Sequence, residues 1–205
     1  MYATAFIVGP ENGPKAALTD LCMDIGFRAV MRFCDIEEAE RQARQTPVCF
    51  FLFNSQMNSD EIKSKAHKIR FSRSKQVRFS PMVCFVEGPD PSLISTYLQI
   101  GFDDIIAPPY SGRRVAQRLE TQIERRLVYY ETSGYFGPDR GIGHFMDNQK
   151  LDNLEQAKQN AYRRIEIIRR FDGNTNIVSE KWTSLICLDK RSRARCVQVE
   201  SERML

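Results

Sequence analysis

The stretch from Gly101 to Tyr110, GFDDIIAPPY, contains a helix end, a short strand and a rigid loop in immediate succession. Gly101 is suited to end the helical pattern before it, because glycine readily adopts the left-handed conformation that closes helices. Ile105-Ile106 is a short apolar run of the kind found in buried strands. Pro108-Pro109 excludes a helix directly afterwards. The order helix, strand, loop is one unit of an α/β fold.

The same unit recurs along the first two thirds of the chain. Apolar runs of strand length are each followed by turn residues and then by apolar positions at helical spacing. We expect strands at 3–8, 27–33, 47–53 and 81–86 and within 101–110, and helices at 15–25, 35–44, 60–71, 92–100 and 111–130. Alternation of this kind predicts a parallel sheet covered by helices on both faces. The expected fold class is α/β, a doubly wound, flavodoxin-like five-stranded sheet with strand order 2-1-3-4-5.

The regular pattern ends after Ser133. We therefore expect an α/β domain over 1–133, a linker rich in glycine and aromatic residues over 134–148, and a C-terminal extension over 149–205. In the extension, a helix over about 149–172 is predicted from the spacing of Leu151, Leu154, Ala161, Ile165 and Ile168. Two β-rich runs around the basic turn at 190–193 then predict a hairpin.

The composition favours an ordinary globular protein, with 42% hydrophobic and 27% charged residues among 205. No apolar run approaches the roughly 20 residues that a membrane helix needs, so a cytoplasmic protein is expected. The six cysteines show no CxxC spacing, which favours free buried thiols over zinc or disulfides. A net charge of +4 is too weak to indicate nucleic-acid binding by itself.

The stretch 101–110 resembles the fifth-strand region of bacterial response-regulator receiver domains, usually Gly-Ala-Asp-Asp-Tyr-Leu-Thr-Lys-Pro-Phe. The resemblance implies a CheY-like receiver fold, and a cis peptide bond before Pro109, where the family has one after its lysine. The segment from Tyr135 to Arg140, YFGPDR, is similar to tails of some alphaproteobacterial receiver-like proteins, which implies an origin in that group.

The receiver family carries an acidic pair after strand one, a phosphoacceptor aspartate after strand three, a Ser/Thr after strand four and a lysine after strand five. Together they bind Mg²⁺ and transfer a phosphoryl group. In this sequence the matching positions hold no such side chains; they are Gly9, Pro10, Asn54, Val86 and Pro108, with Met57 fixing the register of Asn54. The acid Glu11 stands one place after the acidic-pair positions. An amide is a poor nucleophile and a poor Mg²⁺ ligand, and valine has no hydroxyl. We therefore expect no phosphorylation, no catalytic residue, no metal site and no cofactor.

The receiver family uses the face of its fourth helix, fifth strand and fifth helix for dimers and for downstream partners. The resemblance implies that this face binds partners here through Thr96, Tyr97, Ile105 (at the family's switch-aromatic position), Arg113, Arg114, Gln117 and Arg118. The expected function is that of a pseudo-receiver, a receiver-like adaptor that is not phosphorylated. Its partner would be a signalling protein, such as a histidine kinase, another receiver or a scaffold, or a second copy of the chain.

A run of basic residues that contains no acid indicates a second possible binding surface. It comprises Lys63, Lys65, Lys68, Arg70, Arg73, Lys75 and Arg78. It is either a solvated helix face with its loop, or a dock for an acidic partner or nucleic acid. The second hypothesis is accordingly a receiver-like nucleic-acid effector, an antiterminator or transcription regulator, that also uses the arginines of its tail. A small-molecule binder or an enzyme on the same scaffold is a third.

Overall fold

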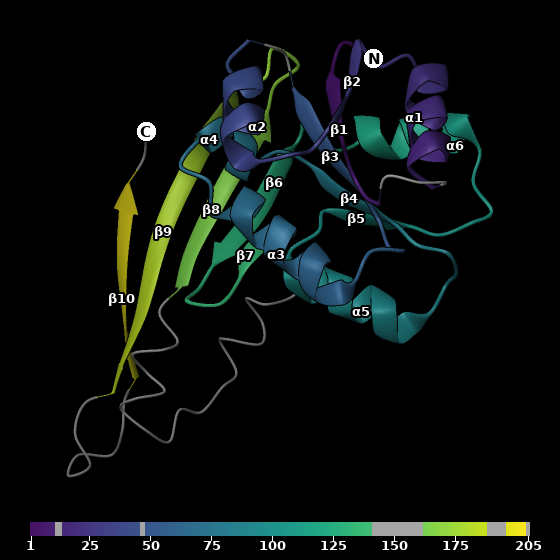
Figure 1. The fold of residues 1–205 in the computed structure, drawn as a ribbon. Coiled ribbons are helices and arrows are strands. Elements are labelled where there is room, and N and C mark those ends of the chain that lie inside the picture. Colours follow the sequence, from purple (N-terminus) through teal and green to yellow (C-terminus); the bar gives the residue numbers. More distant parts are fainter. Residues whose placement is uncertain (11–13, 46–47, 141–161, 188–195, 204–205) are drawn as a thin grey trace. The chain divides into compact units, whose positions relative to one another are not determined.

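The computed structural model describes residues 1–10, 14–45, 48–140, 162–187 and 196–203. They form two compact units (Figure 1). Unit 1 comprises Met1–Arg125 together with Ile168–Asn176, and unit 2 comprises Arg126–Ile167 together with Ile177–Leu205. The segment 168–176 therefore belongs to unit 1 although it lies far downstream in the sequence. Among the described residues, no helix combines the length and the apolar character needed to cross a membrane.

Unit 1 is built on a five-stranded sheet in which every pairing is parallel, in the order β2-β1-β3-β4-β5. This confirms the predicted fold class. The strands are β1 (Thr4–Val8), β2 (Ala29–Arg32), β3 (Cys49–Asn54), β4 (Met82–Phe85) and β5 (Asp104–Ile106). The helices are α1 (Pro14–Ile25), α2 (Ile36–Ala43), α3 (Ser59–Arg70), α4 (Lys75–Arg78), α5 (Pro91–Ile100) and α6 (Gly112–Glu120).

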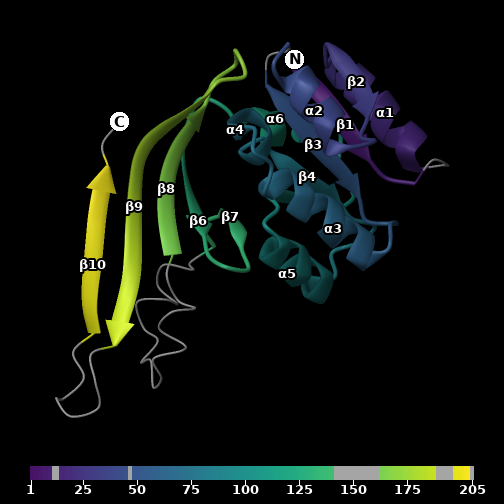
Figure 2. The same ribbon diagram turned by 60° about the vertical axis from the view of Figure 1, so that its left-hand side comes forward.

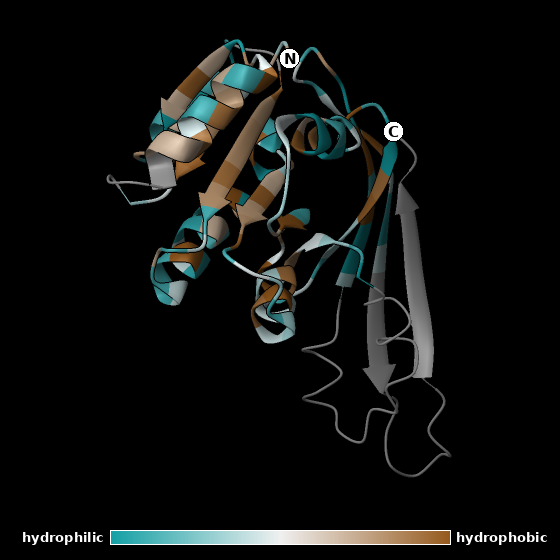
Figure 3. Cartoon of the chain, turned by 90° about the vertical axis from the view of Figure 1, so that its right-hand side faces the viewer, coloured by the Kyte–Doolittle hydropathy of each residue, from teal (hydrophilic) through white to brown (hydrophobic). Residues whose placement is uncertain are grey.

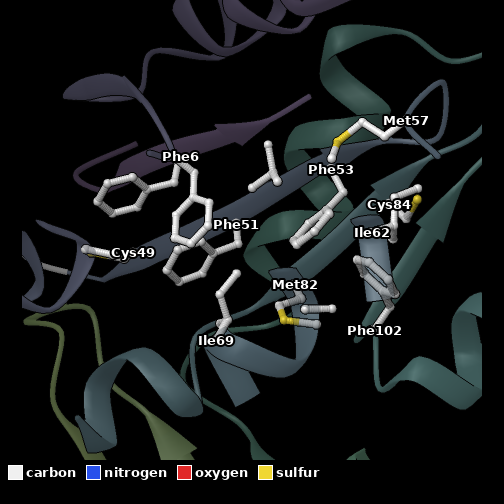
Figure 4. Packing of buried hydrophobic residues seen from close by; sticks show 14 of the residues in the cluster. Phe6, Cys49, Phe51, Phe53, Met57, Ile62, Ile69, Met82, Cys84 and Phe102 are labelled. Carbon is white, nitrogen blue, oxygen red and sulfur yellow. The ribbon is translucent and has the colours of Figure 1, made fainter. Parts of the chain in front are cut away.

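The helices cover both faces of this sheet (Figures 1 and 2). Apolar residues of α1 and α6 pack on one face, and those of α2, α3, α4 and α5 pack on the other. Strand β3 is buried along its whole length, because its side chains alternate between the two cores. Phe51 stacks on Phe6 with ring centroids 5.2 Å apart, and Phe53 meets Phe102 edge-on at 4.9 Å (Figure 4). Figure 3 shows the hydrophobic residues, in brown, along the strands of unit 1.

Local sequence signals explain where the elements of unit 1 begin and end. Asp35 caps α2 by accepting the backbone N–H of Glu38 at 2.7 Å. Gly101 ends α5 with a φ of 100°, a left-handed conformation that favours glycine. The peptide bond between Pro108 and Pro109 is cis, as expected from the family resemblance. Cys22 and Cys84 are buried free thiols, and burial raises the pKa of each to about 12.

Unit 2 contains a second five-stranded sheet, in the order β10-β9-β8-β6-β7. Its strands are β6 (Arg126–Glu131), β7 (Phe136–Pro138), β8 (Tyr162–Arg169), β9 (Thr175–Cys187) and β10 (Cys196–Arg203). Strand β9 pairs antiparallel with β10. The ends of β8 and β9 that flank the connecting turn are counted in unit 1.

Two helix predictions were wrong in the second half of the chain. The helix expected to reach Tyr130 ends at Glu120, and the aromatic and β-branched residues after it form β6. The extension helix expected over 149–172 is strand β8 over 162–169. Ile165 and Ile167 are fully buried and alternate with partly exposed residues, a period of two that suits β-branched side chains in a strand. The predicted linker is described only over 134–140, where Phe136–Pro138 forms strand β7. Residues 149–161 of the predicted helix and the basic turn at 190–193 lie outside the described residues.

Candidate functional site

The position that corresponds to the phosphoacceptor lies at the carboxyl end of β3. Asn54 is 9% exposed there, and its Oδ1 accepts the backbone N–H of Gln56 at 2.8 Å. This turn is the usual local chemistry of asparagine. Gly9 follows β1 and lies directly against Asn54, since a Cβ built on Gly9 would be 3.3 Å from the Cβ of Asn54. A larger residue at position 9 would require Asn54 to move by a few tenths of an ångström.

The other degenerate positions lie at the same edge. Val86 is buried in the hydrophobic core, and its backbone N–H donates to the carbonyl of Ile106 at 3.0 Å. Pro108 is exposed after β5, and Pro10 follows Gly9 after β1. Asn54, Val86 and Pro108 all line one cavity of about 380 Å³. The structure therefore brings together positions that are far apart in the sequence, as the family resemblance implied.

The lining of this cavity is largely apolar. The complete set is Ala17, Leu18, Asn54, Gln56, Phe85, Val86, Glu87, Pro108 and Tyr110. Among the described residues of the lining, Glu87 is the one acid and none is a base; Nε2 of Gln56 donates a hydrogen bond to Oε1 of Glu87. This contact links the loop after β3 to the loop after β4. Sequence reasoning missed it, because nothing distinguishes Gln56 or Glu87 from ordinary loop residues.

The Mg²⁺ ion of the receiver family does not fit the described residues at this edge, which include Gly9, Pro10 and Asn54 but not residues 11–13. Mg²⁺ requires several hard oxygen ligands in octahedral geometry, usually including carboxylates. Gly9 and Pro10 supply no carboxylate, Asn54 is neutral and its oxygen already accepts a hydrogen bond. In the part of the chain that the structure describes, no three metal-ligating side chains form a cluster.

The face formed by α5, β5 and α6 presents most of the residues predicted to bind partners. Thr96, Arg113, Arg114, Gln117 and Arg118 are exposed and Ile105 is partly buried. Tyr97, in contrast, was wrongly assigned to this surface, because it is only 2% exposed. It lies on the inward side of α5, its ring meets Phe102 at 5.9 Å, and burial raises its pKa.

Charge is unevenly distributed over this face. Helix α5 carries no charged residue and exposes Leu93, whereas α6 carries three arginines. Arg118 is fixed to β5, because its Nε donates to Oδ2 of Asp104 at 2.8 Å and its Nη2 donates to the carbonyl of Ile105 at 2.9 Å. Arg113 and Arg114 have no ion pair among the described residues. The face thus places two exposed cations beside an uncharged helix.

The basic run divides in the structure into exposed and buried members. Lys63, Lys68, Arg73 and Lys75 are exposed, Arg78 is partly buried, and Lys65 lies 3.3 Å from Glu61. Arg70 was wrongly included in the surface patch, since it is 1% exposed. Its guanidinium lies inside unit 1, where it donates to the carbonyl of Ser80 at 2.9 Å and to Oδ2 of Asp103 at 2.6 Å.

The structure also contains a buried charge cluster that sequence reasoning missed. Asp103 lies between two arginines, with Oδ2 2.6 Å from Nη2 of Arg70 and Oδ1 2.7 Å from Nη2 of Arg169. All three side chains are at most 2% exposed. We call these three residues the arginine–aspartate cluster. The acid is visible in the quoted stretch 101–110, but its partners are 33 residues before it and 66 residues after it.

Comparisons with known proteins found similar solved structures only. No protein-family model and no curated protein matches the chain. The receiver domain of a sensor histidine kinase from Pseudomonas aeruginosa, with a magnesium ion coordinated in its active site cleft, is 19% identical. That match covers 58% of this chain and 95% of the other, with a TM-score of 0.45.

Two further structures give similar values. The receiver domain of a response regulator from Bacteroides fragilis is 21% identical over 60% of this chain and 97% of its own, with a TM-score of 0.44. A response regulator from Chloroflexus aurantiacus is 16% identical over 58% and 95%, with a TM-score of 0.46. Unit 1 has the parallel strand order 2-1-3-4-5 with helices on both faces, which is the doubly wound, flavodoxin-like arrangement.

Proposed function

We propose that this protein is a pseudo-receiver of bacterial signal transduction, which binds a signalling partner and is not switched by aspartyl phosphorylation. The observation that carries the proposal is the lining of the cavity at the carboxyl edge of the first sheet. Asn54, Val86 and Pro108 meet there without the carboxylate, the hydroxyl or the ammonium that phosphoryl transfer uses. A module of this kind has no catalytic residue and acts through its surface.

The surface proposed for binding is the face of α5, β5 and α6. Arg113 and Arg114 would contact acidic side chains of the partner, while the uncharged α5 lets apolar and hydroxyl groups approach without burying a charge. Arg118 would hold α6 in place through its contacts with Asp104. The expected partner is a histidine kinase, a receiver or a scaffold protein with an acidic patch, and a homodimer through this face is the other arrangement.

The nucleic-acid hypothesis has less support from the described arginines of the tail. Arg163 pairs with Glu180 at 3.1 Å and also with Glu131, and Arg164 lies 2.7 Å from Glu166. Arg169 is buried. Arginines held by carboxylates or by the interior offer little charge to phosphates. The basic residues at 190–195 lie outside the described residues.

The absence of phosphorylation is tested by incubating the full chain with acetyl phosphate and Mg²⁺ and measuring the intact mass. We expect no phosphoryl adduct on the protein or on Asn54→Asp, because the carboxylate alone lacks the Mg²⁺ ligands and the cation that transfer needs. A Mg²⁺-dependent adduct on the wild-type loop after β3 would refute the pseudo-receiver reading.

The binding face is tested by capturing partners with the full chain from nuclease-treated extract of its own cells. The variant Arg113→Glu/Arg114→Glu should lose the captured signalling protein. Lys63→Glu/Lys68→Glu reverses two exposed charges on α3 and serves as the matched control, which should retain it. Equal loss in both variants would show that the α5–β5–α6 face is not the binding surface. Recovery that disappears with nuclease would favour the nucleic-acid effector.

A further inference from the structure

The acceptors around Arg169 come from three separate loops of unit 1. Its Nε donates to the carbonyl of Phe79 at 2.5 Å, its Nη1 to the carbonyl of Gln122 at 3.2 Å, and its Nη2 to Oδ1 of Asp103 at 2.7 Å. Phe79 precedes β4, Asp103 precedes β5, and Gln122 follows α6. These loops lie at the amino end of the parallel strands, the edge opposite to the degenerate phosphorylation site.

The three acceptors match the shape of a guanidinium group. Their contacts use Nε, Nη1 and Nη2 of one planar group, which a lysine ammonium cannot reproduce because its donors radiate from a single nitrogen. The remaining void beside Arg169 is only about 10 Å³, which is about the size of one water. The site is therefore closely filled by an arginine side chain.

The shared carboxylate is held in place independently of Arg169. Oδ2 of Asp103 accepts from Arg70 at 2.6 Å and from the backbone N–H of Met82 at 2.8 Å, which leaves Oδ1 directed to Arg169. Arg70 in turn donates to the carbonyls of Gly101, Arg78 and Ser80. One half of the site is thus preorganised by residues within 1–125.

The turn that carries Arg169 is also fitted to its surroundings. The backbone N–H of Glu124 donates to the carbonyl of Arg169 at 2.8 Å, and the carboxylate of Glu124 accepts from Nη1 of Arg170 at 2.6 Å and from the N–H of Phe171 at 3.1 Å. Glu124 has a φ of 56°, a left-handed conformation that is uncommon for a residue with a side chain. Strain of this kind persists only where the surrounding structure imposes it.

We propose that the receiver-like unit contains an arginine-binding site at the amino edge of its sheet, formed by Asp103 and the carbonyls of Phe79 and Gln122, and that the chain's own Arg169 is its ligand. The ligand class is a guanidinium group. Residues 1–125 then form a receiver fold with one internal site open, and the turn at 168–176 completes it. This inference concerns the fold of unit 1 and does not depend on the proposed partner.

The first experiment uses the wild-type full chain. Hydrogen exchange of arginine Nε–H groups is followed by ¹⁵N-resolved NMR, with Arg113 as the exposed reference. Because the Nε–H groups of Arg70 and Arg169 are buried and donate to carbonyls, both should exchange at least about 100-fold more slowly than that of Arg113. An Arg169 Nε–H that exchanges as fast as that of Arg113 would overturn the proposal.

The second experiment supplies the ligand from solution. Arg169→Ala in the full chain should lower the thermal midpoint by about 10 °C, because it leaves buried acceptors without a donor. Methylguanidinium at millimolar concentration should recover part of that loss, whereas methylammonium at the same concentration should recover none. Wild-type protein should respond to neither ion, since its site is occupied. Equal effects of the two ions on Arg169→Ala, or no effect of either, would contradict a guanidinium site.

Discussion

The two edges of the first sheet differ in what their loops contain. At the carboxyl edge, a cavity of about 380 Å³ has a mostly apolar lining, with one acid among the residues that the structure describes there. At the amino edge, two arginines and an aspartate are buried, and the void beside them is about 10 Å³. Ligands of open α/β sheets bind at the carboxyl edge. In this protein the buried ion pairs of Asp103 with Arg70 and Arg169 lie at the opposite edge, where they stabilise the fold.

The comparison predicts that the largest effects on stability will come from the amino edge. Asp103→Asn should reduce the free energy of unfolding by about 3 kcal/mol or more, because it leaves Arg70 and Arg169 buried without a counter-ion. Asp104→Asn is the matched control, since it changes the adjacent residue but breaks only a partly exposed pair with Arg118, worth at most about 1 kcal/mol. Urea unfolding measures both. Equal losses would show that burial of the cluster does not matter.

A smaller effect on stability is expected from the carboxylate of Glu124, which accepts hydrogen bonds from the turn at 168–176. The hydrogen bond from Arg170 lowers the pKa of Glu124, with a further contribution from the N–H of Phe171. A lowered pKa in the folded state contributes stability above the ordinary value near 4.5, and that contribution is lost as the pH falls through the folded pKa. Glu124→Gln should therefore lower the thermal midpoint by a few degrees at pH 7, and the difference should shrink as the pH falls below 4.5.

Comparing pH 3 with pH 7 shows whether the stability lost in Glu124→Gln depends on the charge of Glu124. A deficit of Glu124→Gln that is the same at pH 3 and pH 7 would mean that the charge of Glu124 is not what stabilises the turn. Asp90 provides a control within the same unit, because its pKa is lowered by hydrogen bonds from Ser92 at the start of α5, far from the turn in sequence. Asp90→Asn should show a pH dependence of the same sign without altering the exchange of the Arg169 Nε–H.

The smallest effect on stability is expected from adding Mg²⁺, which would act at the carboxyl edge of the sheet. Because the described residues of this edge lack the ligands that Mg²⁺ prefers, 10 mM Mg²⁺ should change the thermal midpoint by less than about 1 °C relative to EDTA. Asn54→Asp should behave in the same way, since one carboxylate does not replace the missing acidic pair. Specific stabilisation of the wild type by Mg²⁺, absent with the same concentration of Ca²⁺, would mean that this edge still contains a magnesium site.

Much of unit 1 could be predicted from its sequence because its signals are local. Apolar runs, caps and turn residues indicate the five strands and five of the six helices without reference to distant residues, and their alternation predicts a parallel sheet. The short helix α4 was not predicted, and the expected strand order is that of the doubly wound, flavodoxin-like arrangement. The degenerate positions are assigned in a different way, by aligning the motif of the receiver family with this sequence residue by residue. In the extension, the spacing of Ile165 and Ile168 fitted a helix, whereas the structure buries Ile165 and Ile167, two residues apart, in a strand that pairs with other strands.

The arginine–aspartate cluster could not be predicted, because its signal is not local. Arg70 directly follows the buried Ile69 at the end of α3, within a run of basic residues that otherwise face solvent. A long cationic side chain is rarely buried unless it is paired, and nothing near Arg70 in the sequence supplies the pair. The assignment of Tyr97 to the surface was wrong for a related reason, since a tyrosine on an amphipathic helix can lie on the buried or on the exposed side of that helix.

The position of Arg169 also has a consequence for the order in which the protein forms. Synthesis proceeds from the amino terminus, so the strands and helices of unit 1 have all emerged from the ribosome well before Arg169 is added. The contact between Asp103 and Arg169 spans 66 residues, and contacts of large sequence separation form late because closing a long loop is entropically unfavourable. Until then the nascent protein has to keep the Asp103 carboxylate hydrated or paired with Arg70 alone. Unit 1 therefore reaches its final packing only after Arg169, in the second half of the chain, has been synthesised.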